Sequence, residues 1–186
     1  LRCQGGPMSE ATRRVMIAVR LKAVDPAAST ALSTLRRTMP GEAPVSLGRY
    51  DLWELEMSPG TDTMDRVRSL IASYTDIVNP NKQSWMELGH PDSVPGEDRS
   101  QTRVWLVVKD HDDSRSENWS RILRASRFGV RRVQCGVLWR LGYPPGTARE
   151  VAEENAMAVA LTRSRRVGLL ANPVSQEAKL YDEASS

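Results

Sequence analysis

The sequence predicts an α+β protein made of two similar β-α-β(β)-α-β repeats, with mostly antiparallel sheets backed by helices. Two observations lead to this prediction. Strand-like runs that begin at Val15 and Val104 are each followed by a helix-like segment, and an Asn-Pro pair recurs late in each half, at Asn79-Pro80 and Asn172-Pro173. We therefore expect the two halves to be related by a pseudo-two-fold axis, as a dimer contained in one chain.

The first half opens with a strand and a helix. Apolar residues alternate with other side chains over residues 15–21, which is the period of a half-buried strand. Asp25 and Pro26 favour a helix start, because aspartate can cap the helix and proline suits its first position. Gly48 follows in the strand-like run 45–57, where a glycine is typical of a bend or a close backbone approach.

A second helix and a short strand complete the first half. Met64, Val67 and Ile71 share one helix face. Because proline disfavours helical backbone at the residue before it, we expect Asn79 to end this helix. Pro80 then begins an extended run.

The second half repeats this order. Ser116 is the expected cap of its first helix, and Thr147 with Glu150 is the expected capping box of its second. Gly136 lies 88 residues after Gly48, so we expect both repeats to bend at the same place. Asn172 and Pro173 are expected to form the same helix-to-strand joint as Asn79 and Pro80.

Changes in composition suggest the boundaries of the repeats. Residues 89–101 are rich in polar residues, proline and glycine, and are interpreted as a linker. Residues 1–13 carry no periodicity and are interpreted as a leader. The repeats themselves are expected over residues 14–88 and 102–182.

Charge and composition limit the class of protein. The 186 residues carry a net charge of +3, and the excess of basic residues lies in the second half, which favours an anionic partner there. No run is long and apolar enough for a membrane span, and no secretory signal is recognisable, so we expect a cytoplasmic protein. Cys135 lies in an apolar run and is interpreted as a buried, unreactive residue.

The sequence offers little for catalysis. With two histidines in all, no nucleophile-and-base arrangement is recognisable, so we expect no catalytic residue and no cofactor. His111 stands beside Asp110, Asp112 and Asp113, which are metal-ligand types. Because adjacent loop residues seldom converge on one ion, we favour a solvated loop over a metal site.

Two features of the sequence suggest an interaction surface. Arginines of the second half could form a basic patch that binds phosphate or docks a protein, or could simply be a solvated helix face, the reading that we favour; they are Arg121, Arg124, Arg127, Arg131, Arg132, Arg163, Arg165 and Arg166. Most tryptophans fall in core-like patterns, which argues against nucleic acid. Trp53 alternates away from Leu52 and is the candidate for an exposed contact at a subunit surface.

The chain resembles a tandem of two units of the PurS family, the small subunit of phosphoribosylformylglycinamidine synthase. The matching text is "RLKAVDPAASTAL", "VSLGRYDLWELEM" and "VNPN" in the first half, and "GVLW" and "LLANPV" in the second. Arg49 stands where the family often has lysine. The acidic pair that commonly follows Asn-Pro in the family is absent from both halves, and the second half lacks the Asp-Pro helix start.

The resemblance implies a non-catalytic assembly role in purine biosynthesis. In that family an ATP-dependent large synthase subunit performs the chemistry, a glutaminase subunit supplies ammonia, and the small subunit pairs with itself and helps to hold the two together. Interaction residues are expected at Gly48, Arg49, Trp53, Asn79, Pro80, Gly136, Asn172 and Pro173. The alternative from another class is a duplicated binding module that holds an anionic ligand or RNA on the basic second half.

Overall fold

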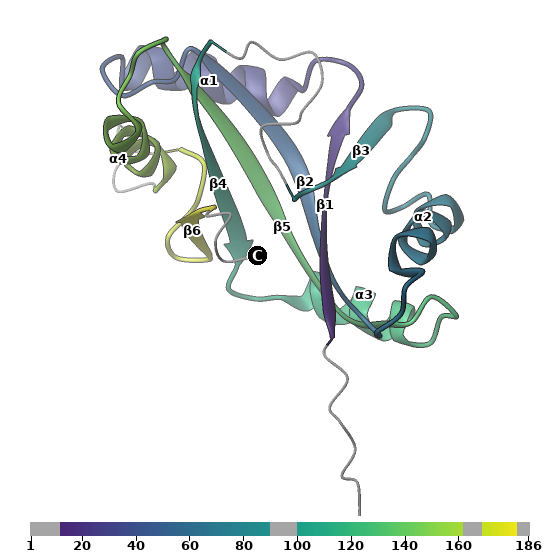
Figure 1. The fold of residues 1–186 in the computed structure, drawn as a ribbon. Helices are drawn as coiled ribbons and strands as arrows, with labels where there is room; N and C mark the ends of the chain where they lie inside the picture. Colours follow the sequence, from purple (N-terminus) through teal and green to yellow (C-terminus); the bar gives the residue numbers. More distant parts are fainter. Residues whose placement is uncertain (1–11, 90–99, 162–168, 182–186) are drawn as a thin grey trace, which may run out of the picture.

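The computed structural model describes residues 12–89, 100–161 and 169–181. Within these ranges the protein has an α+β fold, with one six-stranded antiparallel sheet and four helices (Figure 1). The expected α+β class and antiparallel pairing are confirmed. Residues 1–11 of the expected leader, most of the expected linker and three of the arginines, Arg163, Arg165 and Arg166, lie outside the described residues. The expected end of the leader at residue 13 is wrong, because β1 already begins at Arg13.

Both halves of the chain have the element order β-α-β-α-β. The first half contains β1 (Arg13–Leu21), α1 (Pro26–Thr38), β2 (Ser46–Met57), α2 (Thr63–Ser73) and β3 (Gln83–Glu87). The second contains β4 (Thr102–Asp110), α3 (Ser114–Arg124), β5 (Val130–Tyr143), α4 (Arg149–Ala160) and β6 (Gln176–Leu180).

The strands form a single sheet in the order β3-β1-β2-β5-β4-β6. Its centre is the ladder between β2 and β5, which runs antiparallel from the pair Ser46 and Gly142 to the pair Met57 and Val130. The three strands of one half therefore continue into the three strands of the other. Backbone hydrogen bonds across this ladder join the halves into one sheet, where each half was expected to have a sheet of its own.

The four helices pack on one face of this sheet and cover two apolar cores. The first core contains inward residues of β1, β2 and the beginning of β5 beneath α2, and the second contains those of β4 and the end of β5 beneath α4. Each of the other two helices packs on the core of the opposite half: α1 contributes Leu35 to the second core, and α3 contributes Leu123 to the first. Each half thus completes the core of the other.

A third cluster lies on the opposite face of the sheet, which no described helix covers. Its buried members come from all four central strands and from the residue that follows β3: Met16, Ala18, Tyr50, Leu52, Leu88, Trp105 and Leu138. None of the described helices is both long and apolar enough to cross a membrane.

The predicted start of α1 is confirmed. The Asp25 side chain accepts hydrogen bonds from the backbone N–H groups of Ala27 and Ala28, at 2.8 and 3.3 Å. Pro26 occupies the first helical position, where the missing proline N–H leaves no hydrogen bond unmade. Local sequence alone explains this helix start.

The predicted caps of the second half are wrong. Helix α3 begins at Ser114, so Ser116 lies inside the helix, where it is buried and accepts a hydrogen bond from the N–H of Cys135 at 2.7 Å. Thr147 donates its hydroxyl to the carbonyl oxygen of Pro144 at 2.8 Å, and α4 begins at Arg149 without a side-chain cap. The two hydroxyls that were expected to cap helices make other hydrogen bonds instead: that of Ser116 bonds to a neighbouring strand, and that of Thr147 bonds within a turn.

Candidate interaction sites

Asn79 and Pro80 form a turn that leads into β3, and the prediction that Asn79 ends a helix is wrong. Helix α2 already ends at Ser73. The carbonyl oxygen of Asn79 accepts a hydrogen bond from the N–H of Gln83 at 2.7 Å. The Gln83 side chain in turn accepts one from the N–H of Asn79, also at 2.7 Å. The asparagine side chain accepts from the N–H of Asn81 at 3.0 Å.

Asn172 and Pro173 form the same turn before β6. The N–H of Gln176 donates to the carbonyl oxygen of Asn172 at 2.7 Å, and the Gln176 side chain accepts from the N–H of Asn172 at 3.0 Å. The Asn172 side chain accepts from the N–H of Val174 at 3.0 Å. The repeated sequence is therefore Asn-Pro-x-x-Gln, and the glutamine, which sequence analysis missed, closes the turn in both halves.

These two turns lie before the two edge strands of the sheet, so the structure does not bring them together. Each turn is anchored to the strand that pairs with it. The N–H of Lys22 donates to the carbonyl oxygen of Lys82 at 2.9 Å, and the N–H of His111 donates to that of Ser175 at 2.7 Å. The backbone of His111 thus has a structural role, because it holds the second turn beside the end of β4. The described residues contain no group of three or more histidine, cysteine or acidic side chains that could hold a metal ion.

Trp53 is buried, and its predicted exposure is wrong. Its side chain is 1% exposed and lies in the first core, edge-on to the ring of Trp119 at 5.3 Å between centroids. Alternation along β2 places Trp53 and Leu52 on opposite faces as expected. Both faces are buried, however, because helices cover one and the third cluster occupies the other.

The strand register gives a different alignment of the halves from the one based on glycine. Trp53 lies opposite Ile17 in the β1–β2 ladder, and Trp139 lies opposite Leu106 in the β4–β5 ladder. These tryptophans are 86 residues apart, whereas Gly48 and Gly136 are 88 apart. The glycines therefore stand two residues out of step, and the prediction that they mark the same bend is wrong.

A longer repeated sequence supports the alignment by tryptophan. The pattern Leu-Trp-x-Leu-x-x-x-Pro-Gly-Thr occupies residues 52–61 and again residues 138–147. It covers the end of a long central strand and the turn before a helix in both halves. Comparison of the two halves at a spacing of 86 would have found this repeat.

The two glycines have different surroundings. A Cβ atom at Gly136 would lie 2.9 Å from the carbonyl oxygen of Val108, so this position requires glycine for the close approach of β4. A Cβ atom at Gly48 would meet the side chains of Tyr50 and Arg140 at 3.2 and 3.4 Å. The irregularity in the β2–β5 register lies at Glu56 and Met57 and at neither glycine.

Arg49 lies at the start of β2, beside the beginning of α1. Its guanidinium contacts the Asp51 carboxylate at 3.1 Å and the Asp25 carboxylate at 3.7 Å. It lines a hollow of about 210 Å³ together with Arg20, Tyr50 and Arg140. The contacts to Asp25 and Asp51 give Arg49 a role in fixing the α1 cap against the sheet.

Glu54 forms a buried charge cluster that sequence analysis missed. Its carboxylate is 5% exposed and contacts Arg14 on β1 at 2.5 Å and Lys109 on β4 at 2.7 Å. One acidic side chain on β2 thereby joins strands of both halves on the helix-free face. Alternation along β2 indicated which face Glu54 occupies, but its partners lie 40 and 55 residues away in sequence.

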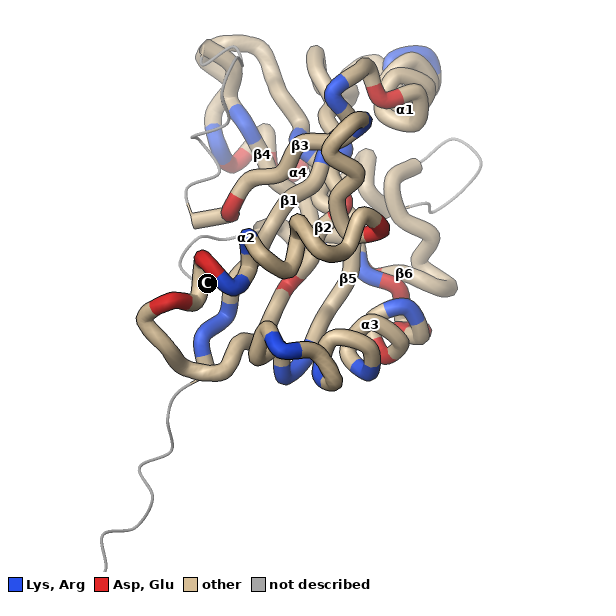
Figure 2. The backbone as a smooth tube through the Cα atoms, turned by 90° about the vertical axis from the view of Figure 1, so that its right-hand side faces the viewer, with Lys and Arg blue, Asp and Glu red and all other residues tan. Residues whose placement is uncertain are grey.

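A basic groove lies between α3 and the first part of β5. It has a volume of about 660 Å³, and its lining includes Arg121, Arg124 and Arg132 together with Asp113 and Glu117. Figure 2 shows Lys and Arg gathered at the end of the molecule where α3 lies. The two carboxylates offset part of the charge, so the groove is only moderately basic.

Among the described residues, the titratable groups with clearly shifted pKa values are Cys135 and Tyr143 on β5 and Glu177 on β6. Burial raises the pKa of the Cys135 thiol, and the nearby Arg115 guanidinium opposes this shift only in part. The predicted burial of Cys135 is confirmed. Burial also raises the pKa of Tyr143. A hydrogen bond from Lys179 lowers the pKa of the exposed Glu177.

The described structure defines a class of protein, a one-layer antiparallel sheet backed on one face by helices, with grooves beside two of them. No family model, no curated protein and no solved structure gives a significant match to this chain.

Proposed function

We propose that this protein is a non-catalytic assembly subunit made of two PurS-like repeats, which acts in an ATP-dependent glutamine amidotransferase of purine biosynthesis. One observation carries the proposal. The Asn-Pro-x-x-Gln turns make the same three hydrogen bonds, at nearly the same distances, and attach to the neighbouring strand in the same way. Matching hydrogen bonds at matching strand positions are what a duplicated ancestral unit would retain.

The sheet supports the interpretation of the chain as an internal dimer. The sheet order places the strands of the two halves symmetrically about the β2–β5 ladder. Helices α1 and α3 each pack on the core of the other half. A covalent link gives such halves a high effective concentration, so that they pair at any level of expression.

An assembly role also suits the chemistry of the described residues. The candidate interaction residues stabilise turns and strand contacts, and none of them forms a nucleophile-and-base pair. We propose that the partners are the large synthase subunit and the glutaminase subunit. The chain would hold these subunits together without contributing a reacting group.

The experiment is affinity purification of the tagged full chain from its native cells, after mild crosslinking, with the tag alone as control. We expect to recover both a large synthase subunit and a glutaminase. Recovery of neither would overturn the proposal. A second readout is purine-independent growth of a bacterial strain that lacks its own small subunit, when that strain expresses the full chain and its copurified partners.

The basic groove favours a second candidate function, the binding of an anionic ligand such as RNA. Arg121, Arg124 and Arg132 line this groove. Titration with a short RNA at about 50 and about 200 mM salt tests it, since phosphate contacts weaken steeply with salt. Replacing Arg121 and Arg124 by alanine should abolish such binding, while replacing Arg36 and Arg37 on α1 removes equal charge elsewhere. Equal effects of the two double variants would contradict a site in the groove.

A further inference from the structure

The outer edge of β3 offers backbone hydrogen-bonding groups to a partner. β3 is the first strand in the sheet order, and β1 is the only described strand that pairs with it. An exposed strand edge of this kind can accept an additional strand from another polypeptide.

The hydrogen bonds to β1 show which residues of β3 face outward. The N–H of Leu88 donates to the carbonyl oxygen of Met16 at 2.8 Å, and the carbonyl oxygen of Lys82 accepts from Lys22 at 2.9 Å. Bonding toward one neighbour alternates along an antiparallel strand. Even-numbered residues of β3 therefore bond to β1, and the backbone N–H and C=O groups of Trp85 and Glu87 point away from the sheet.

A groove of about 510 Å³ lies between this strand and α2. Its apolar walls include Ile71 and Ala72 of α2, Val78 and Pro80 of the connecting turn, and Trp85 of β3. Trp85 is only partly buried against the first core, so its indole is available to a ligand in the groove. The size and lining suit one or two apolar side chains.

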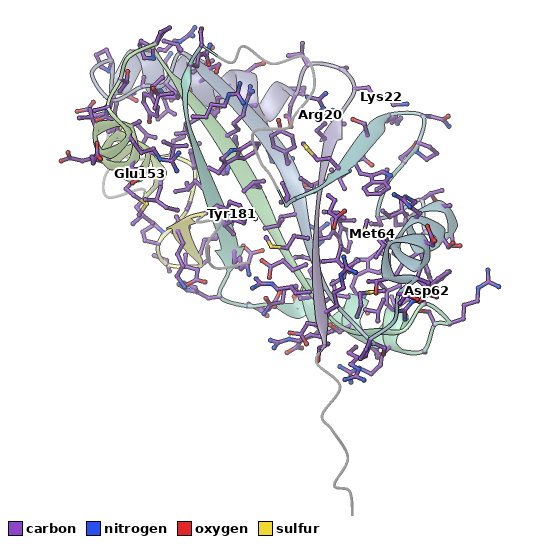
Figure 3. The ribbon with its side chains drawn as sticks, in the orientation of Figure 1. Arg20, Lys22, Asp62, Met64, Glu153 and Tyr181 are labelled. Atoms are coloured by element: carbon purple, nitrogen blue, oxygen red, sulfur yellow. The ribbon has the colours of Figure 1, made fainter. Side chains whose placement is uncertain are left out.

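The charged lining of the groove is basic. Among the described residues that line it, Lys22 and Arg68 are the two charged ones, and none is acidic. Arg68 already contacts Asp65 at 2.9 Å, whereas the Lys22 ammonium donates to the carbonyl oxygen of Pro80 at 2.6 Å, a neutral acceptor. Figure 3 labels Lys22 near the start of β3. The lysine therefore presents a positive charge at that end of the groove.

We propose that β3 and this groove bind an extended segment of a partner protein, which adds to the sheet as a seventh strand. An apolar side chain of the segment packs against Trp85 and Ile71. A carboxylate, from an acidic side chain or from the C-terminus, lies near Lys22. Because Lys22 marks the start of β3, a C-terminal segment that ends there runs antiparallel to β3.

This inference rests on the proposed assembly function and names the chemistry of one partner contact. Two residues of β3 supply outward groups, which is enough for a short ladder of backbone hydrogen bonds. Main-chain bonds provide affinity in this mode of recognition, while the groove and the lysine provide selectivity.

The test uses the full chain and a library of displayed hexapeptides with free C-termini, followed by fluorescence polarisation with the selected peptides. We expect selection of peptides that combine an apolar residue with a carboxylate. Glu87→Pro removes an outward N–H and should weaken binding by about tenfold or more. Glu87→Ala keeps that N–H and should change binding by less than about twofold.

Two further variants locate the site. Leu180→Pro makes the matching change on the opposite edge strand, β6, and should leave peptide binding unchanged. If the C-terminus supplies the carboxylate, Lys22→Ala should weaken the binding of peptides with free C-termini and leave the binding of their C-terminal amides unchanged. If an acidic side chain supplies it, Lys22→Ala should weaken the binding of both forms. Circular dichroism checks that every variant is folded.

Three outcomes would overturn the inference. The first is that no hexapeptide is enriched, and the second is that Glu87→Pro and Leu180→Pro weaken binding equally. The third is a dimer of the full chain that dissociates in Glu87→Pro, which would assign the edge to a second copy. If peptides fail to bind but affinity purification still recovers both enzyme subunits, this inference fails and the assembly function stands.

Discussion

Trp53 and Trp139 hold matching positions in the sheet, 86 residues apart in the chain. Ile17 lies opposite the first and Leu106 opposite the second, in ladders of the same antiparallel kind. Both indoles point toward the helical layer, and they lie in the first and second cores respectively. The two halves thus place the same large side chain at the same point beneath their helices.

Replacement of Trp53 by alanine should strongly destabilise the protein. The indole is 1% exposed, so its removal leaves a cavity in the first core. We expect a loss of about 3–5 kcal/mol in the free energy of unfolding, measured by urea titration. Val24→Ala, at an 80% exposed position, is the control and should change it by less than about 0.5 kcal/mol. A small effect at Trp53 would contradict its burial.

The Glu54 cluster should contribute to stability at neutral pH. Glu54→Gln removes the carboxylate that Arg14 and Lys109 share. Because both cations are partly exposed, we expect a loss of about 1–3 kcal/mol in unfolding free energy, less than for a fully buried pair. Glu177→Gln breaks an exposed contact with Lys179 and should cost less than about 1 kcal/mol. Equal losses in the two variants would show that the Glu54 cluster is not specially stabilising.

The two Asn-Pro-x-x-Gln turns should respond alike to mutation. Asn79→Ala and Asn172→Ala each remove a side-chain oxygen that accepts one backbone N–H at 3.0 Å. We expect each change to lower the unfolding free energy by about 1 kcal/mol. Chemical denaturation of the single variants measures both losses, and a difference of more than about 1.5 kcal/mol would argue against equivalent turns.

Tyr143 should make the protein less stable at alkaline pH. Burial raises its pKa in the folded state, so the unfolded chain releases this proton at a lower pH than the folded protein. Stability attributable to this group is therefore constant below about pH 10 and falls above it, by up to about 1.4 kcal/mol per pH unit. Unfolding measured from pH 8 to 11 should show this decline.

Tyr143→Phe provides the matching test. The buried hydroxyl has no hydrogen-bond partner among the described residues, so its removal should raise stability at neutral pH by about 1 kcal/mol. The same variant should show a shallower alkaline decline than the wild type. An unchanged decline would assign the alkaline effect to other groups, of which Cys135 is the first candidate because burial raises its pKa as well.

Local patterns in the sequence correctly predicted those strands and helix ends that depend on interactions between residues close together in the chain. Alternation predicted β1 and β4, and the Asp25-Pro26 pair predicted the start of α1. Ser116 shows the limit of such patterns, since its hydroxyl bonds to Cys135, 19 residues away on an adjacent strand. Capping propensity cannot reveal a partner that only the folded sheet provides.

The candidate sites were harder to predict than the elements. Asn79 and Pro80 marked a real joint, but the glutamine that completes it acts through a side-chain hydrogen bond across four residues. The burial of Trp53 depends on packing on both faces of the sheet, which alternation within one strand does not report. Trp85 and Lys22 line one groove only because β3 folds back beside β1.

Each of α1 and α3 packs on the core of the other half, and this arrangement has a consequence for synthesis on the ribosome. When the first half has emerged, its hydrophobic core still lacks Leu123 and the ring of Trp119, which come from a helix not yet made. Leu35 of the finished α1 must likewise wait for β4, β5 and α4. The nascent chain therefore exposes apolar surface until translation is nearly complete. Chaperones should stay bound to it until late in synthesis and then release it in one step.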